Sequence, residues 1–313
     1  MTLQEQASID HEVFQPALFS VRKLVFSKLM DQQIINLYDE YTHKPLNRQE
    51  FIRRLVMLTG SLAAAMAVLP MLEGNYAKAS VTDDEDLFIE TISYPGVNDT
   101  EMKAYVARPK KEGKYAAVVV IHENRGLNAH IEDVTRRAAK AGYLAIAPNA
   151  LAPLGGTPAN EDEARQLFTK LNAADSQQNF IRVFDYLTGR KDYNGLPGCV
   201  GFCWGGAMAN HLAIKVPSLK AAVSFYGRQP DLTDVSKIKA AVQLHYAGLD
   251  ERINAGMAAY EEAPKKNNIV YEQYLYEGVN HAFHNDTSAS RYNQAAAILA
   301  WKRTIDFFAK HLK

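Results

Sequence analysis

The chain has 313 residues, of which 47% are hydrophobic and 22% are charged, the usual balance of a globular protein. Its 35 basic and 35 acidic side chains cancel, so no net field attracts nucleic acid or an anionic membrane surface. No block of basic residues interleaved with aromatic residues is present either. We therefore exclude nucleic acid as a partner, whereas the length alone permits one large domain or two small ones.

The two cysteines, Cys199 and Cys203, are four residues apart. If they share a strand and its end, their Cα atoms lie roughly 13 Å apart at ~3.3 Å per residue. A disulfide requires less than about 7 Å, so we expect both thiols to be free. No metal-ligand spacing of the C-x-x-C type occurs, and we expect neither a metal nor a cofactor.

An uncharged apolar segment, residues 55–72, follows Arg53 and Arg54. Eighteen residues are just enough to span a membrane, although alanine, glycine and serine make this segment a weak span. Upstream, residues 47–53 (NRQEFIR) resemble the twin-arginine export motif, with Gln49 in place of one arginine. Downstream, residues 77–79 (AKA) have the small-x-small pattern of a signal-peptidase site.

Two interpretations of this front segment remain open. In the first, residues 48–79 are a twin-arginine-like signal or anchor that contacts the export machinery or the membrane, and the protein is exported to the periplasm. In the second, Asn47 and Glu50 form a capping box, the apolar run is a packing helix, and the protein stays in the cytoplasm. Residues 15–45 also have a helical pattern, so residues 1–80 are expected to form a helical N-terminal extension.

From about residue 84 the sequence alternates between strand and helix patterns. Residues 87–94 and 102–108 are expected to form an antiparallel pair, and residues 115–122 (YAAVVVIH) have the continuous apolar character of a strand buried on both faces. Further strands are expected at 143–147, 199–202, 220–225, 241–246 and 270–276, and helices at 130–141, 160–172, 175–189, 205–215, 255–267 and 290–312. This alternation predicts one α/β domain, residues 81–313, with a mostly parallel sheet covered by helices on both faces.

The segment GFCWGG, residues 201–206, follows a short apolar strand and precedes a helix. It matches the G-x-S-x-G nucleophile elbow of α/β-hydrolases with Cys203 in the serine position. Glycines two residues before and after the nucleophile are expected because those positions crowd each other. The helix dipole behind Cys203 favours the thiolate, which is the nucleophilic form. A glycine-rich turn with a buried structural cysteine is the alternative.

Two further residues stand in the order that this fold uses for its triad, nucleophile then acid then histidine. Asp250 follows the strand expected at 241–246, and His281 follows the strand expected at 270–276. Carboxyl ends of parallel strands are where such sheets bind ligands. We therefore predict that His281 acts as base to Cys203 and that Asp250 orients the imidazole.

The segment HENRGLN, residues 122–128, comes directly after the long buried strand. In this fold the loop at that place supplies one donor of the oxyanion hole, and the residue after the nucleophile supplies the other. We predict that these donors are the backbone N–H groups of Asn124 and Trp204.

Together, the HENRGLN and GFCWGG segments, the Asp250 loop and the NHAF segment at residues 280–283 resemble the dienelactone hydrolase family over about residues 88–313. The resemblance implies an α/β-hydrolase fold with a triad of Cys203, Asp250 and His281, and a small ester or lactone as substrate. It also implies that Glu123 holds the resting thiol and is displaced when substrate binds, which protects the cysteine from oxidation.

The resemblance is less informative about the substrate. Relatives use arginines to hold the carboxylate of a dienelactone, and Asn285 stands where the family can place one of them. Arg165 is a candidate for another, with a solvated helix arginine as the alternative. The favoured activity is therefore hydrolysis of a small lactone or ester through an acyl-thioenzyme. The alternatives are a broad carboxylesterase, a non-catalytic binding module and a redox-sensing thiol protein, and the sequence does not indicate the oligomeric state.

Overall fold

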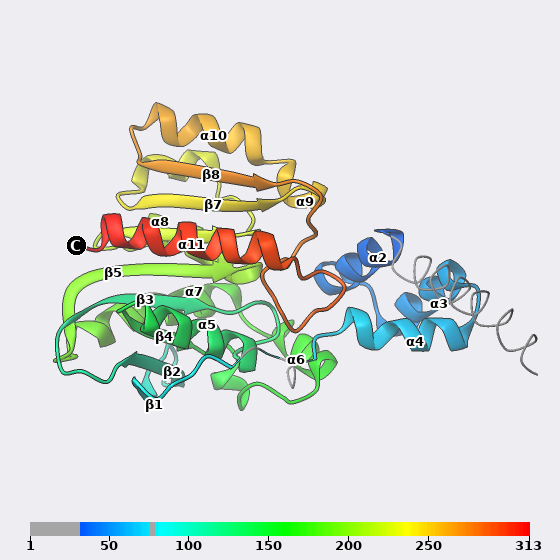
Figure 1. The fold of residues 1–313 in the computed structure, drawn as a ribbon, viewed down its shortest axis with the longest axis horizontal. Coiled ribbons are helices and arrows are strands. Elements are labelled where there is room, and N and C mark those ends of the chain that lie inside the picture. The colour runs from blue at the N-terminus through cyan, green and yellow to red at the C-terminus, as the bar shows by residue number, and fades with distance from the viewer. Residues whose placement is uncertain (1–31, 76–78, 80) are drawn as a thin grey trace, which may run out of the picture. The chain divides into compact units, whose positions relative to one another are not determined.

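The computed structural model describes residues 32–75, 79 and 81–313 (Figure 1). Within this range the chain divides into two compact units, one ending at Gly74 and the other comprising Asn75–Lys313. Each unit has its own set of buried hydrophobic side chains.

The N-terminal unit contains three helices, α2 (Gln32–His43), α3 (Arg48–Thr59) and α4 (Leu62–Leu72). Its core includes Tyr38, Tyr41 and Phe51, and the rings of Tyr41 and Phe51 stack with centroids 4.2 Å apart. Among the described residues no single helix is long and apolar enough to cross a membrane. Only together do helices α3 and α4 have the length and apolar composition of a membrane span, and the two are bent by 111° relative to each other.

The start of α3 has the Asn47 half of the capping box considered in the second interpretation of this segment. Asn47 Oδ1 accepts a hydrogen bond of 2.8 Å from the Glu50 backbone N–H. The Glu50 carboxylate accepts hydrogen bonds from Arg53 and Arg54, and these bonds lower its pKa to about 2. Residues 77 and 78 of the expected cleavage site and the first part of the helical pattern, residues 15–31, lie outside the described residues.

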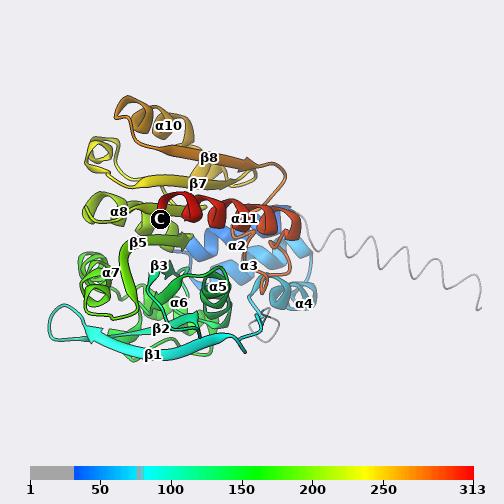
Figure 2. The same ribbon diagram turned by 60° about the vertical axis from the view of Figure 1, so that its left-hand side comes forward.

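The second unit is built on one eight-stranded sheet with the order β1-β2-β4-β3-β5-β6-β7-β8 (Figures 1 and 2). The strands are β1 (Leu87–Pro95), β2 (Glu101–Pro109), β3 (Tyr115–Ile121), β4 (Leu144–Pro148), β5 (Tyr193–Phe202), β6 (Ala221–Phe225), β7 (Ala241–Ala247) and β8 (Tyr271–Tyr276). β1 pairs with β2, and β2 with β4, in antiparallel orientation, while every other neighbouring pair is parallel. The predicted α/β fold with a mostly parallel sheet is confirmed.

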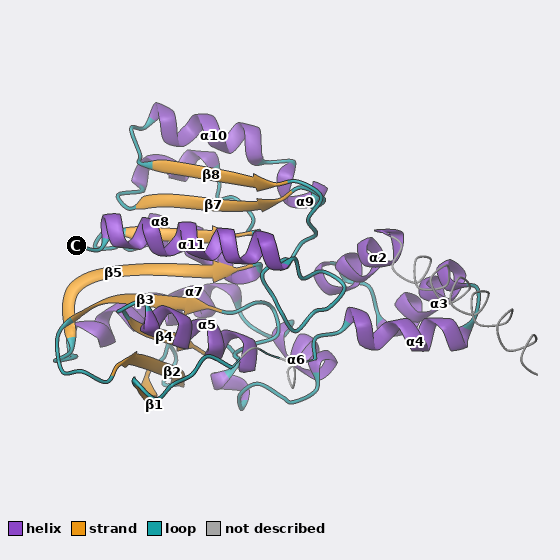
Figure 3. Cartoon of the chain, in the orientation of Figure 1, coloured by secondary structure: helices purple, strands orange, loops and turns teal. Residues whose placement is uncertain are grey.

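Helices cover both faces of the sheet, as Figure 3 shows. One face packs against α7 (Ala173–Thr188), α8 (Trp204–Lys215) and α10 (Met257–Lys266), and the other against α5 (Ala129–Lys140) and α11 (Gln294–His311). Strand β3 illustrates why its sequence is apolar throughout. Its side chains alternate between the two cores, Val119 in one and Val118 and Val120 in the other, and all three are fully buried.

Several element boundaries differ from those expected. Strand β5 begins at Tyr193 instead of Cys199, because its first half pairs with β3 through an irregular register that its glycine and proline residues obscure in the sequence. The helix expected at 255–267 is preceded by a separate short helix, α9 (Glu251–Asn254), and α10 starts after Gly256. The helix expected at 160–172 is the shorter α6 (Glu161–Phe168). Short 3-10 helices lie at Ala152–Leu154 and Leu232–Lys237.

Candidate active site

Cys203 occupies the turn between the end of β5 and the start of α8. Its backbone has φ 56° and ψ −111°, a conformation that non-glycine residues rarely adopt. Such strained conformations occur mainly at functional sites. The side chain is nearly buried, with 8% of the residue exposed, and neither cysteine forms a disulfide, as expected.

The flanking glycines are required by close backbone approach, as the sequence predicted. A Cβ atom on Gly201 would lie 1.8 Å from the carbonyl oxygen of Gly205. A Cβ atom on Gly205 would lie 2.3 Å from the carbonyl oxygen of Ile121, the last residue of β3. The first turn of α8 is therefore pressed against both β5 and the end of β3, and no side chain fits between them.

Asp250 and His281 lie at the carboxyl ends of β7 and β8. Asp250 Oδ2 is 2.5 Å from His281 Nδ1, and both residues are buried, with exposed fractions of 4% and 5%. The other carboxylate oxygen of Asp250 accepts a hydrogen bond of 3.2 Å from the Ile253 N–H and so caps α9. The same carboxylate thus fixes a helix start and the orientation of the imidazole.

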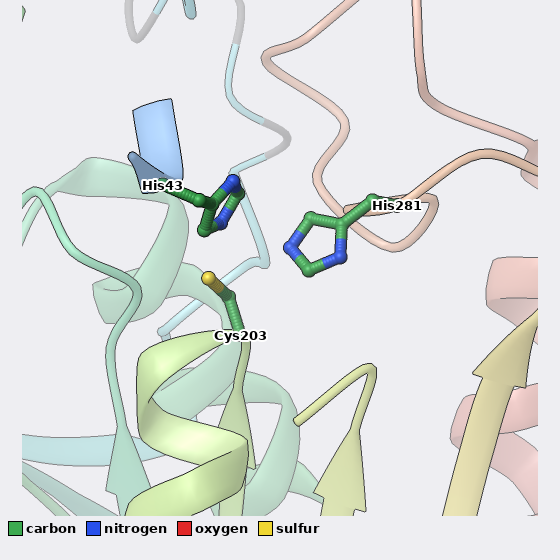
Figure 4. Close-up of side chains that lie close together, drawn as sticks. All are labelled: His43, Cys203 and His281. Atoms are coloured by element: carbon green, nitrogen blue, oxygen red, sulfur yellow. The ribbon is translucent and has the colours of Figure 1, made fainter. Parts of the chain in front are cut away.

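The imidazole of His281 also faces the thiol. The Cys203 Sγ atom and a ring nitrogen of His281 lie within 4.8 Å of each other. In Figure 4 the imidazole of His281 extends toward Cys203, and His43, the third side chain drawn there, belongs to α2. Asp250 engages Nδ1, and Nε2 is the other ring nitrogen of His281.

Glu123, the residue after His122 at the end of β3, is held by two neutral donors. Its Oε2 accepts a hydrogen bond of 2.8 Å from Asn285 Nδ2, and its Oε1 accepts one of 3.4 Å from the Tyr226 hydroxyl. Asn285 Oδ1 also accepts hydrogen bonds from Thr287, so both ends of its side-chain amide are engaged. Asn285, at a position where the family can place an arginine, thus anchors Glu123.

Tyr226 is a further residue of the site. It follows β6, adopts φ 39°, and is 1% exposed, and its ring centroid lies 4.9 Å from that of His281. Burial raises the pKa of its hydroxyl well above the usual value, and the negative charges of Glu123 and Cys203 raise it further. Tyr226 thus stays a neutral donor beside both groups.

The loop after β3 lies against the elbow. His122 is fully buried, and its ring stacks on that of Trp204 with centroids 5.5 Å apart and an interplanar angle of 13°. Burial lowers the pKa of His122 to about 4. Together with the contact of Gly205 with Ile121, this packing brings together the two segments that carry the predicted donors, Asn124 and Trp204.

Arg165 lies on α6 and pairs with Asp162 of the same helix, with 3.8 Å between Nε and Oδ1. Near the start of that helix is a pocket of about 290 Å³. Its lining includes Arg125, Leu127, Thr157 and Glu161, and the Arg125 guanidinium lies 3.8 Å from the Glu161 carboxylate. A space of this size next to the loop after β3 is suited to part of a small organic molecule.

The loop that carries His281 is tied to helix α5, which the sequence did not indicate. Asp286 accepts hydrogen bonds from His130 at 2.8 Å and from Arg137 at 2.9 Å. Between these residues, His284 is buried among aromatic rings, and burial lowers its pKa well below the usual value. These contacts anchor the loop that follows His281 to α5.

The fold is that of an α/β-hydrolase. The family model described as "Dienelactone hydrolase family" matches residues 102–312. The chain belongs to that family, and it is therefore a hydrolase that acts on carboxylic esters.

The similarity extends over most of the second unit. A Synechocystis protein named "Putative carboxymethylenebutenolidase" is 31% identical over 246 residues, which cover 73% of this chain and 99% of that protein. The Escherichia coli protein named "Putative hydrolase fragment YghX" is 49% identical over 107 residues, 33% of this chain and 92% of the fragment. Among solved structures, "Putative Dienelactone Hydrolase" from Klebsiella pneumoniae has a TM-score of 0.64 at 28% identity, covering 72% of this chain and 99% of that one.

Proposed function

We propose that the protein hydrolyses a small lactone or carboxylic ester with Cys203 as nucleophile, His281 as base and acid, and Asp250 as the residue that orients His281. The observation that carries this proposal is the strained elbow at Cys203 facing an imidazole whose Nδ1 lies 2.5 Å from a buried carboxylate. This is the geometric relation by which triads are recognised on unrelated folds.

In the first half-reaction His281 Nε2 takes the thiol proton, and the sulfur of Cys203 attacks the carbonyl carbon of the substrate. A C–S bond forms, and the carbonyl oxygen becomes an oxyanion that accepts hydrogen bonds from the N–H groups of Asn124 and Trp204. Collapse of this intermediate breaks the C–O ester bond. The leaving alkoxide takes the proton from His281, and in a lactone it remains attached to the acyl group as a hydroxyl.

In the second half-reaction water replaces the leaving group. His281 removes a proton from the water, whose oxygen attacks the thioester carbon, and the second tetrahedral intermediate is held by the same two amides. Breaking the C–S bond releases the carboxylic acid and returns the proton to the sulfur. Asp250 remains ionised and stabilises the imidazolium that forms in both halves.

We further propose that Glu123 restrains the thiol in the empty site. Its carboxylate is buried, Tyr226 contacts both this carboxylate and the ring of His281, and both the Glu123 and Cys203 charges act on that tyrosine. Because Tyr226 and Asn285 are neutral donors, they hold the carboxylate without cancelling its charge. A substrate that displaces the carboxylate would leave Cys203 paired with His281 alone.

The substrate that we propose is a compact ester or lactone without a strict need for a carboxylate group. Asn285 supplies no positive charge, because it is an amide and its groups are bound to Glu123 and Thr287. Arg165 lies against Asp162 on its own helix. A panel of aryl esters, aliphatic lactones and carboxylate-bearing lactones, assayed with wild type and Cys203→Ala, tests this view. Strong preference for the carboxylate-bearing lactones would contradict it, and no Cys203-dependent turnover of any member would refute the function.

A further inference from the structure

The Glu123–Asn124 peptide group carries both the carbonyl of Glu123 and the N–H of Asn124. In a trans peptide these two groups are rigidly coplanar and point in opposite directions. Whatever fixes the Glu123 carbonyl therefore also fixes the direction of the Asn124 N–H. In the proposed function this N–H is a donor to the oxyanion, so its direction matters for the rate.

His122 is the residue that contacts this carbonyl. Its Nδ1 lies 2.6 Å from the Glu123 carbonyl oxygen, and its Nε2 lies 3.0 Å from the backbone nitrogen of Ala150, which follows β4. The Ala150 N–H can only donate, so Nε2 is the acceptor and carries no proton. In the neutral ring the proton therefore sits on Nδ1, which donates it to the Glu123 carbonyl.

The ring has no freedom to leave this position. It is fully buried and lies flat on Trp204, and the edges of Phe168 and Phe180 close the remaining sides, with centroids at 6.0 and 6.1 Å. Trp204 is also the residue whose N–H is the second proposed donor. One histidine thus contacts the peptide that bears the first donor and the side chain of the residue that bears the second.

We propose that His122 is a positioning residue of the oxyanion hole, which it orients by donating a hydrogen bond from Nδ1 to the Glu123 carbonyl. The inference rests on the proposed function. Donation to the carbonyl also polarises the peptide group, and this makes the Asn124 N–H a stronger donor. His122 touches neither substrate nor thiol in this role, and its effect is confined to steps that form an oxyanion.

The test compares two reactions of Cys203. Acylation by p-nitrophenyl acetate passes through an oxyanion, whereas alkylation by iodoacetamide displaces iodide from a saturated carbon and forms none. Three variants divide the contributions of His122. His122→Asn keeps a donor near the Nδ1 position. His122→Leu has the shape of the asparagine variant without a donor, and His122→Phe keeps the aromatic contact with Trp204 without a donor.

We expect His122→Leu and His122→Phe to lower the acylation rate constant by about 10- to 100-fold, less than the ~10²- to 10³-fold loss from deleting an oxyanion donor outright. Alkylation should stay within about twofold of wild type, and His122→Asn should recover most of the lost acylation relative to His122→Leu. Saturation kinetics should show the loss in kcat and not in KM.

The proposal is overturned if acylation and alkylation fall together in all three variants, or if His122→Asn acylates no faster than His122→Leu. Should His122→Leu fail to fold, His122→Phe against His122→Asn makes the same comparison. Acylation of Cys203 in the wild-type protein is measured before any variant is made. If no acyl group forms on Cys203, the proposed function itself is refuted.

Discussion

Replacing Asp250 by asparagine removes one charge from the site and leaves its shape. Asparagine is as good an N-cap as aspartate, so the bond to the Ile253 N–H that starts α9 is retained. What disappears is the carboxylate 2.5 Å from His281 Nδ1. Asp250→Asn therefore isolates the electrostatic role of this residue from its structural one.

The size of the effect follows from the geometry. With charge centres about 4 Å apart and an effective dielectric constant of about 20, the carboxylate stabilises an imidazolium by about 4 kcal/mol. At about 1.4 kcal/mol per factor of ten, this corresponds to a loss of about 10³ in kcat. We expect the loss to be smaller than that in His281→Ala, because the asparagine still keeps the imidazole in place.

The assay is steady-state hydrolysis of p-nitrophenyl acetate, with thermal unfolding measured in parallel. A matched control is Asp231→Asn, since Asp231 caps the 3-10 helix Leu232–Lys237 by accepting from the Thr233 N–H and is exposed, unlike the triad residues. The control should keep wild-type kcat. If Asp250→Asn kept more than about a tenth of wild-type kcat while the control was also active, the assignment of Asp250 would be refuted.

Three further predictions concern other parts of the molecule. The free energy of unfolding should fall as the pH drops below about 6.5. Burial lowers the pKa of His122 to about 4 and that of His245 to about 3, so below pH 6.5 the unfolded chain binds protons that the folded chain cannot, and each histidine contributes up to about 1.4 kcal/mol per pH unit. Urea titrations that give equal stability at pH 7.5 and at pH 5 would contradict this. Iodoacetamide should alkylate Cys203 in Glu123→Gln at a rate clearly different from wild type in the absence of substrate, and identical rates from pH 6 to 8 would leave Glu123 a structural residue. If residues 48–79 are an export signal, N-terminal sequencing after expression in a bacterium with a twin-arginine system should give protein starting near residue 80 outside the cytoplasm, whereas full-length protein confined to the cytoplasm would mean a packing helix.

The sequence predicted the elements of the site that depend on local pattern. An elbow flanked by Gly201 and Gly205 is recognisable because backbone crowding there leaves only glycine, and the structure shows this crowding directly. Asp250 and His281 each follow a strand pattern, and parallel strands bring their carboxyl ends to one edge of the sheet. Their position at one edge could therefore be predicted, whereas their contact also depends on β7 and β8 being neighbours in the sheet.

The partners of Glu123 could not be predicted in this way. Tyr226 and Asn285 lie 103 and 162 positions further along the chain, and only the order of strands in the sheet brings them to Glu123. A signal for Tyr226 existed, since it directly follows the strand expected at 220–225, at the same edge as the triad. The proton on His122 Nδ1 depends on the Ala150 N–H, a long-range contact that no sequence pattern encodes.

The central claim is that Cys203 becomes acylated during turnover. Mixing the protein with p-nitrophenyl acetate, quenching in acid within the first turnover and digesting it for mass spectrometry measures this directly. The account predicts an acetyl group on the peptide that contains Cys203, its slow loss in wild type after substrate is exhausted, and its absence in Cys203→Ala. Nitrophenolate release with no acetyl group on Cys203, or equal release by Cys203→Ala, would contradict it.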